Sequence, residues 1–147
     1  MHGFGFFFDK NTVFEAEMIF LCKKYLIMSS QNRIFYLSSC DTCRKIIKSL
    51  PNASTLEFHD IRQNPISENE LDTMHQLSGS FESLFSKKAQ LYKSRDLKNK
   101  NLTEADYKNL ILEHYTFLSR PVFIIDGKIY IGNSQKNVAA VTEVLRQ

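Results

Sequence analysis

The sequence predicts an α/β domain in which a strand–helix–strand unit and a strand–strand–helix unit flank an all-helical segment. Three observations support this order. Strand and helix patterns alternate over residues 33–61, helical spacing dominates residues 67–118, and two apolar runs surround a favoured hairpin turn at residues 126–127. The chain has 147 residues with 43% hydrophobic and 24% charged content, which suits one soluble globular domain.

The first unit begins with "RIFYL" (33–37), a short aromatic and β-branched run that is typical of a strand. A helix is expected from Asp41 to Leu50, and its apolar face consists of Ile46, Ile47 and Leu50. Pro51 and Asn52 end that helix. In "STLEFHDI" (54–61), Leu56, Phe58 and Ile61 indicate a second strand, and the crossover is long enough for a parallel pair.

The all-helical segment opens at Ser67, which forms a capping-box pattern with Glu70. The helix that follows has an expected apolar face of Leu71, Met74 and Leu77, and Gly79 ends it. Two further helical patterns are "ESLFSKKAQLYKS" (82–94) and "LTEADYKNLILEHY" (102–115). The second opens at Thr103 with Asp106 three residues on, an approximate capping box because its acid is not Glu or Gln.

The last unit is a hairpin followed by a helix. "PVFIIDGKIYIG" (121–132) places Asp126-Gly127, a preferred type I′ turn, between two apolar runs. The final helix is expected to turn four residues inward: Val138, Val141, Val144 and Leu145. A βαβ unit followed by a ββα unit is the thioredoxin-like arrangement, here with a helical insertion at about 67–118.

Charge and cysteine content narrow the class of protein. The net charge of +3 is too small to indicate nucleic acid, and the basic stretch 86–100 is typical of a solvated face, with an acidic partner or phosphate as the alternative. Three cysteines indicate a reducing cytoplasm rather than a disulfide scaffold. No apolar run reaches the roughly 18 residues of a membrane span.

The first thirty residues are treated as an N-terminal extension to a domain at 31–147. Met28 precedes "SSQNRIFYLSS" and would make a natural start, so residues 1–27 are interpreted as upstream sequence from a mis-assigned start. The rival interpretation is an extra helix or strand packed on the domain. Cys22 falls in this extension, where a surface loop or a core position is expected for it.

The pair Cys40 and Cys43 lies between the first strand and the first helix. Structural zinc needs four ligands, and the histidines are not spaced to supply them, so no metal is expected. Inert packing is a second alternative, because free cysteine is often buried. Redox chemistry fits best, since a helix N-terminus stabilises a thiolate. Cys40 is then the nucleophile and Cys43 the resolving thiol, with Arg44 one turn further on adding positive charge.

The dipeptide Arg120-Pro121 opens the hairpin. In thioredoxin-like folds a cis proline at this place faces the active-site cysteine, so we predict that this bond is cis and that Arg120 points towards Cys40. The alternative is a trans proline on an edge strand beside a surface arginine.

The sequence resembles the glutaredoxin-linked arsenate reductase family, which also contains the Spx regulators of Gram-positive bacteria. Four segments carry the resemblance in the family's order over about 33–147: "YLSSCDTCRK", "FHDIRQNPISENEL", "SLFSKKAQLYK" and "FLSRPVFIIDGKIYIGN". The likeness to bacterial arsenate reductase-like proteins implies that Cys40 attacks arsenate, that glutathione resolves the adduct and that glutaredoxin reduces the mixed disulfide. It implies oxyanion-binding roles for Arg44 and Arg120, with Thr42 beside them.

Several positions depart from the family's reductases. These usually have serine at Cys43, arginines at Ser86 and near Gly132-Asn133, and histidine at Tyr36. Losing two anion-binding arginines weakens arsenate capture unless Lys87 or Lys88 replaces them.

The expected function is therefore a thiol-dependent oxidoreductase that uses glutathione with glutaredoxin, or thioredoxin, as reductant, with no bound cofactor. Its expected substrate is a small oxyanion or a thiol compound, and neither a membrane nor direct nucleic-acid binding is expected. The alternatives are an Spx-like redox switch that binds RNA polymerase and a general protein disulfide oxidoreductase.

Overall fold

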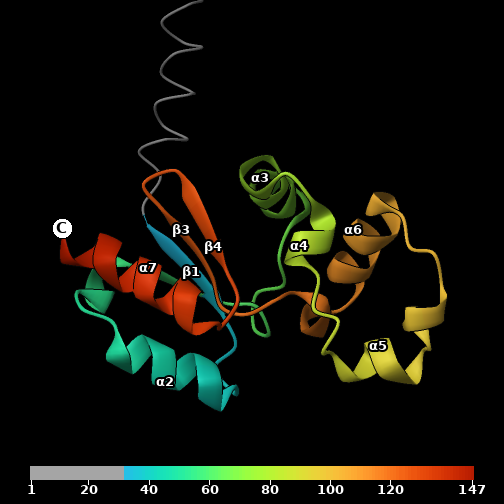
Figure 1. Ribbon diagram of the computed structural model, residues 1–147, viewed down its shortest axis with the longest axis horizontal. Coiled ribbons are helices and arrows are strands. Elements are labelled where there is room, and N and C mark those ends of the chain that lie inside the picture. Colours follow the sequence, from blue (N-terminus) through green and yellow to red (C-terminus); the bar gives the residue numbers. More distant parts are fainter. Residues whose placement is uncertain (1–31) are drawn as a thin grey trace, which may run out of the picture. The chain divides into compact units, whose positions relative to one another are not determined.

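A four-stranded mixed sheet organises residues 32–147, the part of the chain that the computed structural model describes (Figure 1). Its strands are β1 (Arg33–Tyr36), β2 (Glu57–Asp60), β3 (Val122–Ile125) and β4 (Lys128–Ile131). They lie in the order β2-β1-β3-β4. β1 pairs in parallel with β2, and the β1–β3 and β3–β4 pairs are antiparallel. The expectations for residues 1–30, including Cys22, lie outside the described residues.

Helices occupy both sides of this sheet. α2 (Asp41–Ser49) and α7 (Gln135–Arg146) lie together on one side, and the inserted helices lie on the other (Figure 1). The insert contains α3 (Glu68–Ser78), α4 (Phe81–Leu84), α5 (Gln90–Ser94) and α6 (Glu104–Glu113). Short 3₁₀ turns are η1 (Ala53–Thr55), η2 (Leu97–Asn99) and η3 (Tyr115–Phe117). Within the described residues, no helix is both long enough and apolar enough to cross a membrane.

The alternation of side chains along the strands divides the core in two. On β1, Ile34 packs with the cluster under α2 and α7, and Phe35 packs with the cluster under the insert. On β3, Phe123 packs with the cluster under α2 and α7, and Val122 packs with the cluster under the insert. The first cluster also buries Ile46, Leu50, Leu56, Ile125, Val141 and Leu145. The insert therefore covers a face of the sheet that would otherwise be exposed.

Local signals in the sequence fix the ends of several elements. Ser67 and Glu70 form a complete capping box at the start of α3, and Gly79 ends that helix with a φ of 83°. Thr103 and Asp106 also form a complete capping box, so the shorter aspartate still reaches the backbone N–H of the cap residue. The hairpin turn at residues 126–127 has positive φ at both positions, as a type I′ turn requires.

The predicted second strand is confirmed as β2, an edge strand on which Phe58 is 44% exposed while the neighbouring Leu56 and Ile61 enter the core. Two other details of the sequence-based interpretation were wrong. Leu77 is 38% exposed near the end of α3, whose buried residues are Leu71 and Met74.

The second concerns residues 82–94, which do not form one helical unit. The chain leaves α4 at Phe85 and becomes extended, because Phe85 forms a β-bridge with Leu118. The Ser86 N–H donates to the carbonyl of Phe117 at 2.7 Å, and the Ser119 N–H donates to the carbonyl of Leu84 at 2.8 Å. This antiparallel bridge places Ser86 beside Phe117 and Ser119 beside Leu84, so it joins the insert to the residues just before Arg120.

Candidate active site

Cys40 occupies the N-cap position of α2, at the point where the chain leaves the sheet. Its backbone is extended (φ −88°, ψ 115°), and its own N–H donates to the carbonyl of Leu37 at 3.0 Å in a tight turn. No side-chain oxygen caps this helix. The sulfur therefore takes the place that a serine or aspartate oxygen usually occupies, facing N–H groups of the first turn.

The surroundings of Cys40 favour its thiolate. Burial alone raises the pKa of the Cys40 thiol. The backbone N–H and thiol of Cys43, the backbone N–H of Thr42 and the charge of Arg120 lower that pKa by more, so the net result lies below the ordinary cysteine value. Cys40 is partly exposed, so the anion is open to a reactant.

The pKa of Cys43 is shifted in the opposite direction, although Cys43 lies only one helical turn from Cys40. Its side chain is fully buried, and both cysteines are free thiols in this structure. Burial is the main cause that raises the pKa of Cys43 to about 11, and the charge of Cys40 adds to it. Cys43 is thus a protonated donor to the Cys40 sulfur, which is the arrangement expected of a resting resolving thiol.

Arg120 enters the same site from the start of the hairpin. The Arg120–Pro121 peptide bond is cis, as the sequence analysis predicted. The Pro121 carbonyl accepts a hydrogen bond from the Gly132 N–H at 2.9 Å, which ties the start of β3 to the end of β4. The Nη1 atom of Arg120 is buried and has no hydrogen-bond partner. A guanidinium nitrogen in that condition is ready to bind an anion.

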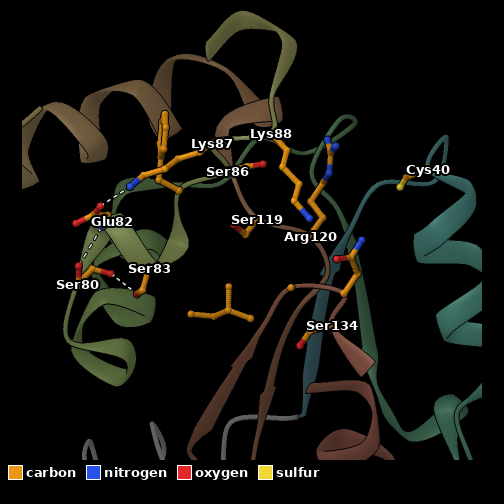
Figure 2. A pocket seen from close by; sticks show the side chains of 14 residues that line it. Cys40, Ser80, Glu82, Ser83, Ser86, Lys87, Lys88, Ser119, Arg120 and Ser134 are labelled. Atoms are coloured by element: carbon orange, nitrogen blue, oxygen red, sulfur yellow. Dashed lines mark hydrogen bonds and ion pairs between the residues drawn. The ribbon is translucent and has the colours of Figure 1, made fainter. Parts of the chain in front are cut away.

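A cavity of about 720 Å³ joins Cys40 to the insert. It is lined by Cys40, Ser80, Glu82, Ser83, Phe85, Ser86, Lys87, Lys88, Ser119, Arg120, Ile131, Gly132, Asn133 and Ser134. Figure 2 shows the Lys88 and Arg120 side chains between Cys40 and the serines of the α4 region. Lys87 is paired with Glu82 at 2.6 Å, whereas Lys88 forms no ion pair within the described residues. The cavity therefore offers two cationic groups beside the thiolate.

The structure divides the predicted site residues into those near the Cys40 sulfur and one that lies away from it. It brings Cys40 and Arg120 to one cavity, places Cys43 behind Cys40, and turns the Thr42 N–H towards the Cys40 sulfur. Arg44 instead pairs with Asp41 on the exposed side of α2 and does not line the cavity. The oxyanion-binding roles of Arg44 and Thr42 remain predictions.

Sequence reasoning missed most of the hydroxyl groups in the cavity, which come from Ser80, Ser83, Ser119 and Ser134. Two of them carried a signal, because Ser80 and Ser134 cap α4 and α7 and stand where helix caps are expected. Ser119 carried none beyond its place next to Arg120. In the described part of the chain, no group of three or more His, Cys, Asp or Glu side chains is arranged to hold a metal ion.

Comparison with known proteins places the chain in a family. Residues 35–141 match the model of the ArsC family, which is most of the chain, and the protein belongs to that family. An uncharacterized protein of Haemophilus influenzae is 27% identical over 109 residues, covering 73% of this chain and 95% of that protein.

Two solved structures share the fold of this chain. An arsenate reductase from Vibrio cholerae aligns with a TM-score of 0.63 at 20% identity, covering 78% of this chain and 97% of that one. An ArsC-family-related protein from Bacteroides fragilis aligns with a TM-score of 0.65 at 20% identity, covering 77% and 98%. The predicted thioredoxin-like α/β fold is thereby confirmed.

Proposed function

We propose that this protein is an arsenate reductase-like thiol oxidoreductase in which Cys40 attacks and Cys43 resolves. One observation carries the proposal: a partly exposed cysteine with a lowered pKa at the N-terminus of α2, backed by a fully buried cysteine whose pKa is about 11. Family membership supports the same class of chemistry.

In the proposed reaction with arsenate, the Cys40 thiolate attacks As(V) and displaces hydroxide, which leaves as water after protonation. The Cys43 thiol loses its proton and its sulfur attacks the Cys40 sulfur. The S–As bond then breaks, its electron pair reduces arsenic to As(III), and arsenite leaves. The two thiols have supplied two electrons and become a disulfide. A thiol reductant such as glutaredoxin with glutathione, or thioredoxin, returns the pair to the reduced state.

Arg120 and Lys88 would hold the anion during the first step. Both line the cavity with Cys40, and a buried unpartnered guanidinium nitrogen gives the anion a hydrogen bond that costs no existing one. The N-terminus of α2 adds the N–H groups of Thr42 and Cys43, which act on the Cys40 sulfur. Lys87 contributes less, because Glu82 already neutralises it.

Cys43 also favours a second candidate, reduction of small or protein disulfides. With a resolving thiol one turn from the nucleophile, no external thiol is needed to complete the exchange. In that reaction Cys40 forms a mixed disulfide with one half of the substrate and Cys43 displaces it.

The test is NADPH oxidation coupled through glutaredoxin, glutathione and their reductase, started with arsenate or with a small disulfide. Wild type is compared with Cys40→Ser, Cys43→Ser and the exposed control Ser94→Ala. We expect Cys40→Ser to abolish turnover and Ser94→Ala to leave it unchanged. Turnover of arsenate that survives Cys43→Ser would assign resolution to glutathione instead. A wild-type rate no higher than that of Cys40→Ser with every substrate would remove the enzyme assignment and favour a redox switch.

A further inference from the structure

The cavity in front of Cys40 is larger than a bare oxyanion requires. Its volume of about 720 Å³ falls within the range of pockets that enclose small organic ligands. It extends from Cys40 to a wall formed by α4, and Figure 2 shows this wall across the cavity from Cys40. Phe85 and Ile131 add apolar surface to the lining. A substrate that fills this space carries a carbon framework as well as the atom that Cys40 attacks.

The positive charge on the Cys40 side of this cavity is not neutralised. The Arg120 Nη1 atom is buried and has no hydrogen-bond partner among the described residues. Lys88 lines the same cavity and forms no ion pair within the part of the chain that the structure describes. Figure 2 shows both side chains between Cys40 and the α4 wall. A buried guanidinium nitrogen needs an acceptor, so a well-matched substrate supplies a negative charge close to the atom that reacts.

The α4 wall differs from the Cys40 side because its polar groups are already paired. Glu82 is the only carboxylate among the described residues that line the cavity, and it accepts a hydrogen bond from the Lys87 Nζ at 2.6 Å. The Ser80 hydroxyl donates to Glu104 at 3.0 Å and accepts from the Glu82 N–H at 3.1 Å. The wall is therefore close to neutral, and the unpaired positive charge is confined to the Cys40 side.

Cys43 favours a disulfide as the bond that this site breaks. Its buried thiol lies one helical turn from Cys40, so the exchange can be completed inside the protein. The Cys40 thiolate attacks one substrate sulfur, the S–S bond breaks, and the first half leaves as a thiolate that takes up a proton. Cys43 loses its proton and attacks the Cys40 sulfur, and the second half leaves with that proton. Two electrons pass to the substrate, and a thiol reductant such as thioredoxin later restores the pair.

We propose that the substrate of this site is a small organic disulfide with a carboxylate a few bonds from its sulfur atoms, and that Arg120 and Lys88 select this carboxylate. This substrate class rests on the proposed function, because it requires Cys40 to attack and Cys43 to resolve. It narrows the second candidate reaction to molecules that enter the cavity. A neutral or cationic disulfide of the same length gives the two cationic groups no partner, so it reacts more slowly.

The experiment compares three disulfides of similar length: dithiodipropionate with two carboxylates, hydroxyethyl disulfide with no charge, and cystamine with two ammonium groups. Each is mixed with the reduced protein, and formation of the Cys40–Cys43 disulfide is followed by quenching and mass spectrometry, so no reductant system is needed. Each rate is divided by the rate of the same disulfide with mercaptoethanol, which removes differences in intrinsic reactivity. We expect a preference of about tenfold for dithiodipropionate over hydroxyethyl disulfide, with cystamine the slowest.

Two variants test the origin of this preference. Lys88→Met keeps a long side chain but removes its charge, and it should lower the preference about threefold. The matched control is Lys98→Met, an exposed lysine of η2 that does not line the cavity, and it should keep the wild-type preference. Raising the salt concentration should also lower the preference in the wild type, because salt screens the attraction between charges.

A preference for dithiodipropionate that falls in Lys88→Met and at high salt, but not in Lys98→Met, supports the substrate class. Rates that do not depend on the charge of the disulfide overturn it, and so does a preference that Lys88→Met leaves intact. If the wild type turns over arsenate but reacts with none of the three disulfides faster than mercaptoethanol does, the substrate class is wrong and the proposed function stands. If iodoacetamide does not modify Cys40 at neutral pH, the site has no reactive thiolate, and the proposed function fails together with the substrate class.

Discussion

Iodoacetamide at neutral pH is expected to label Cys40 in the native protein and to leave Cys43 almost unmodified. The two thiols are three residues apart in one helix turn, so sequence distance gives no reason for such selectivity. The reason is electrostatic and steric. Cys40 is partly exposed with a lowered pKa, and Cys43 is fully buried with a pKa of about 11.

The magnitude follows from these values. The pKa of Cys40 is lowered from an ordinary value of 9.0 and that of Cys43 is raised from the same value to about 11, so the gap between the two is at least about 2 pH units. Near neutral pH the thiolate of Cys43 is then at least about 100 times scarcer than that of Cys40. The more basic thiolate is intrinsically more nucleophilic, which reduces the ratio of rates to about 10. Burial of Cys43 increases the ratio again.

The assay is a brief exposure to limiting reagent, quenching, and fragmentation of the peptide that contains both cysteines. Fragment ions distinguish the two positions, and Cys22 is on a separate peptide. Alkylation in concentrated urea is the control, because in the unfolded chain both thiols return to ordinary pKa values and should be labelled at similar rates. Equal labelling of the two cysteines in the folded protein, or faster labelling of Cys43, would refute the assigned roles.

Three further results are expected. Replacing Arg120 with alanine removes a positive charge that favours the thiolate, so the pKa of Cys40 should rise in a thiolate absorbance titration; a pKa that does not rise would contradict the placement of Arg120. Ser67→Ala removes the capping box of α3 and should cost about 1 kcal/mol of unfolding free energy in urea; an unchanged midpoint would show that the cap contributes nothing. Phe123→Ala should cost about 3–5 kcal/mol, because the ring is fully buried between β3 and the α2–α7 layer. Its matched control, Phe58→Ala, should cost less than about 1 kcal/mol, since that ring is 44% exposed and lies edge-to-face against Tyr36; similar losses in the two variants would contradict the difference in burial of the two rings.

The elements that could be predicted from the sequence are those with strong local causes. The capping residues Ser67 and Thr103, the turn at Asp126-Gly127 and the CxxC at the strand–helix junction all act on the backbone within a few residues of themselves. The cis bond before Pro121 was predicted from a fold already inferred, and the structure confirms it. Local sequence signals were therefore enough to predict the fold and to identify Cys40 as the candidate nucleophile.

The parts that escaped prediction depend on contacts between distant segments. The extended stretch after α4 pairs Phe85 with Leu118, and the segments on either side of this pair contribute Lys88 and Arg120 to one cavity. No spacing pattern in the sequence predicts a β-bridge between residues that are 33 positions apart. The burial of Asp60 was not predicted either, because an aspartate at the end of a strand is usually a solvated turn residue. Only the structure shows that its side chain is buried.

The difference between the two thiols also accounts for the order of the proposed steps. Burial is the main reason that the pKa of Cys43 is high, and the charge of the Cys40 thiolate and its hydrogen bond to Cys43 add to it. When Cys40 forms a bond to a substrate atom, its charge and that hydrogen bond are both lost, whereas Arg120, which lowers the pKa of Cys43, remains. The resolving thiol therefore becomes easier to ionise only after the nucleophile has reacted. A pair arranged in this way holds Cys43 protonated while the site is empty and releases its proton at the step that needs its sulfur.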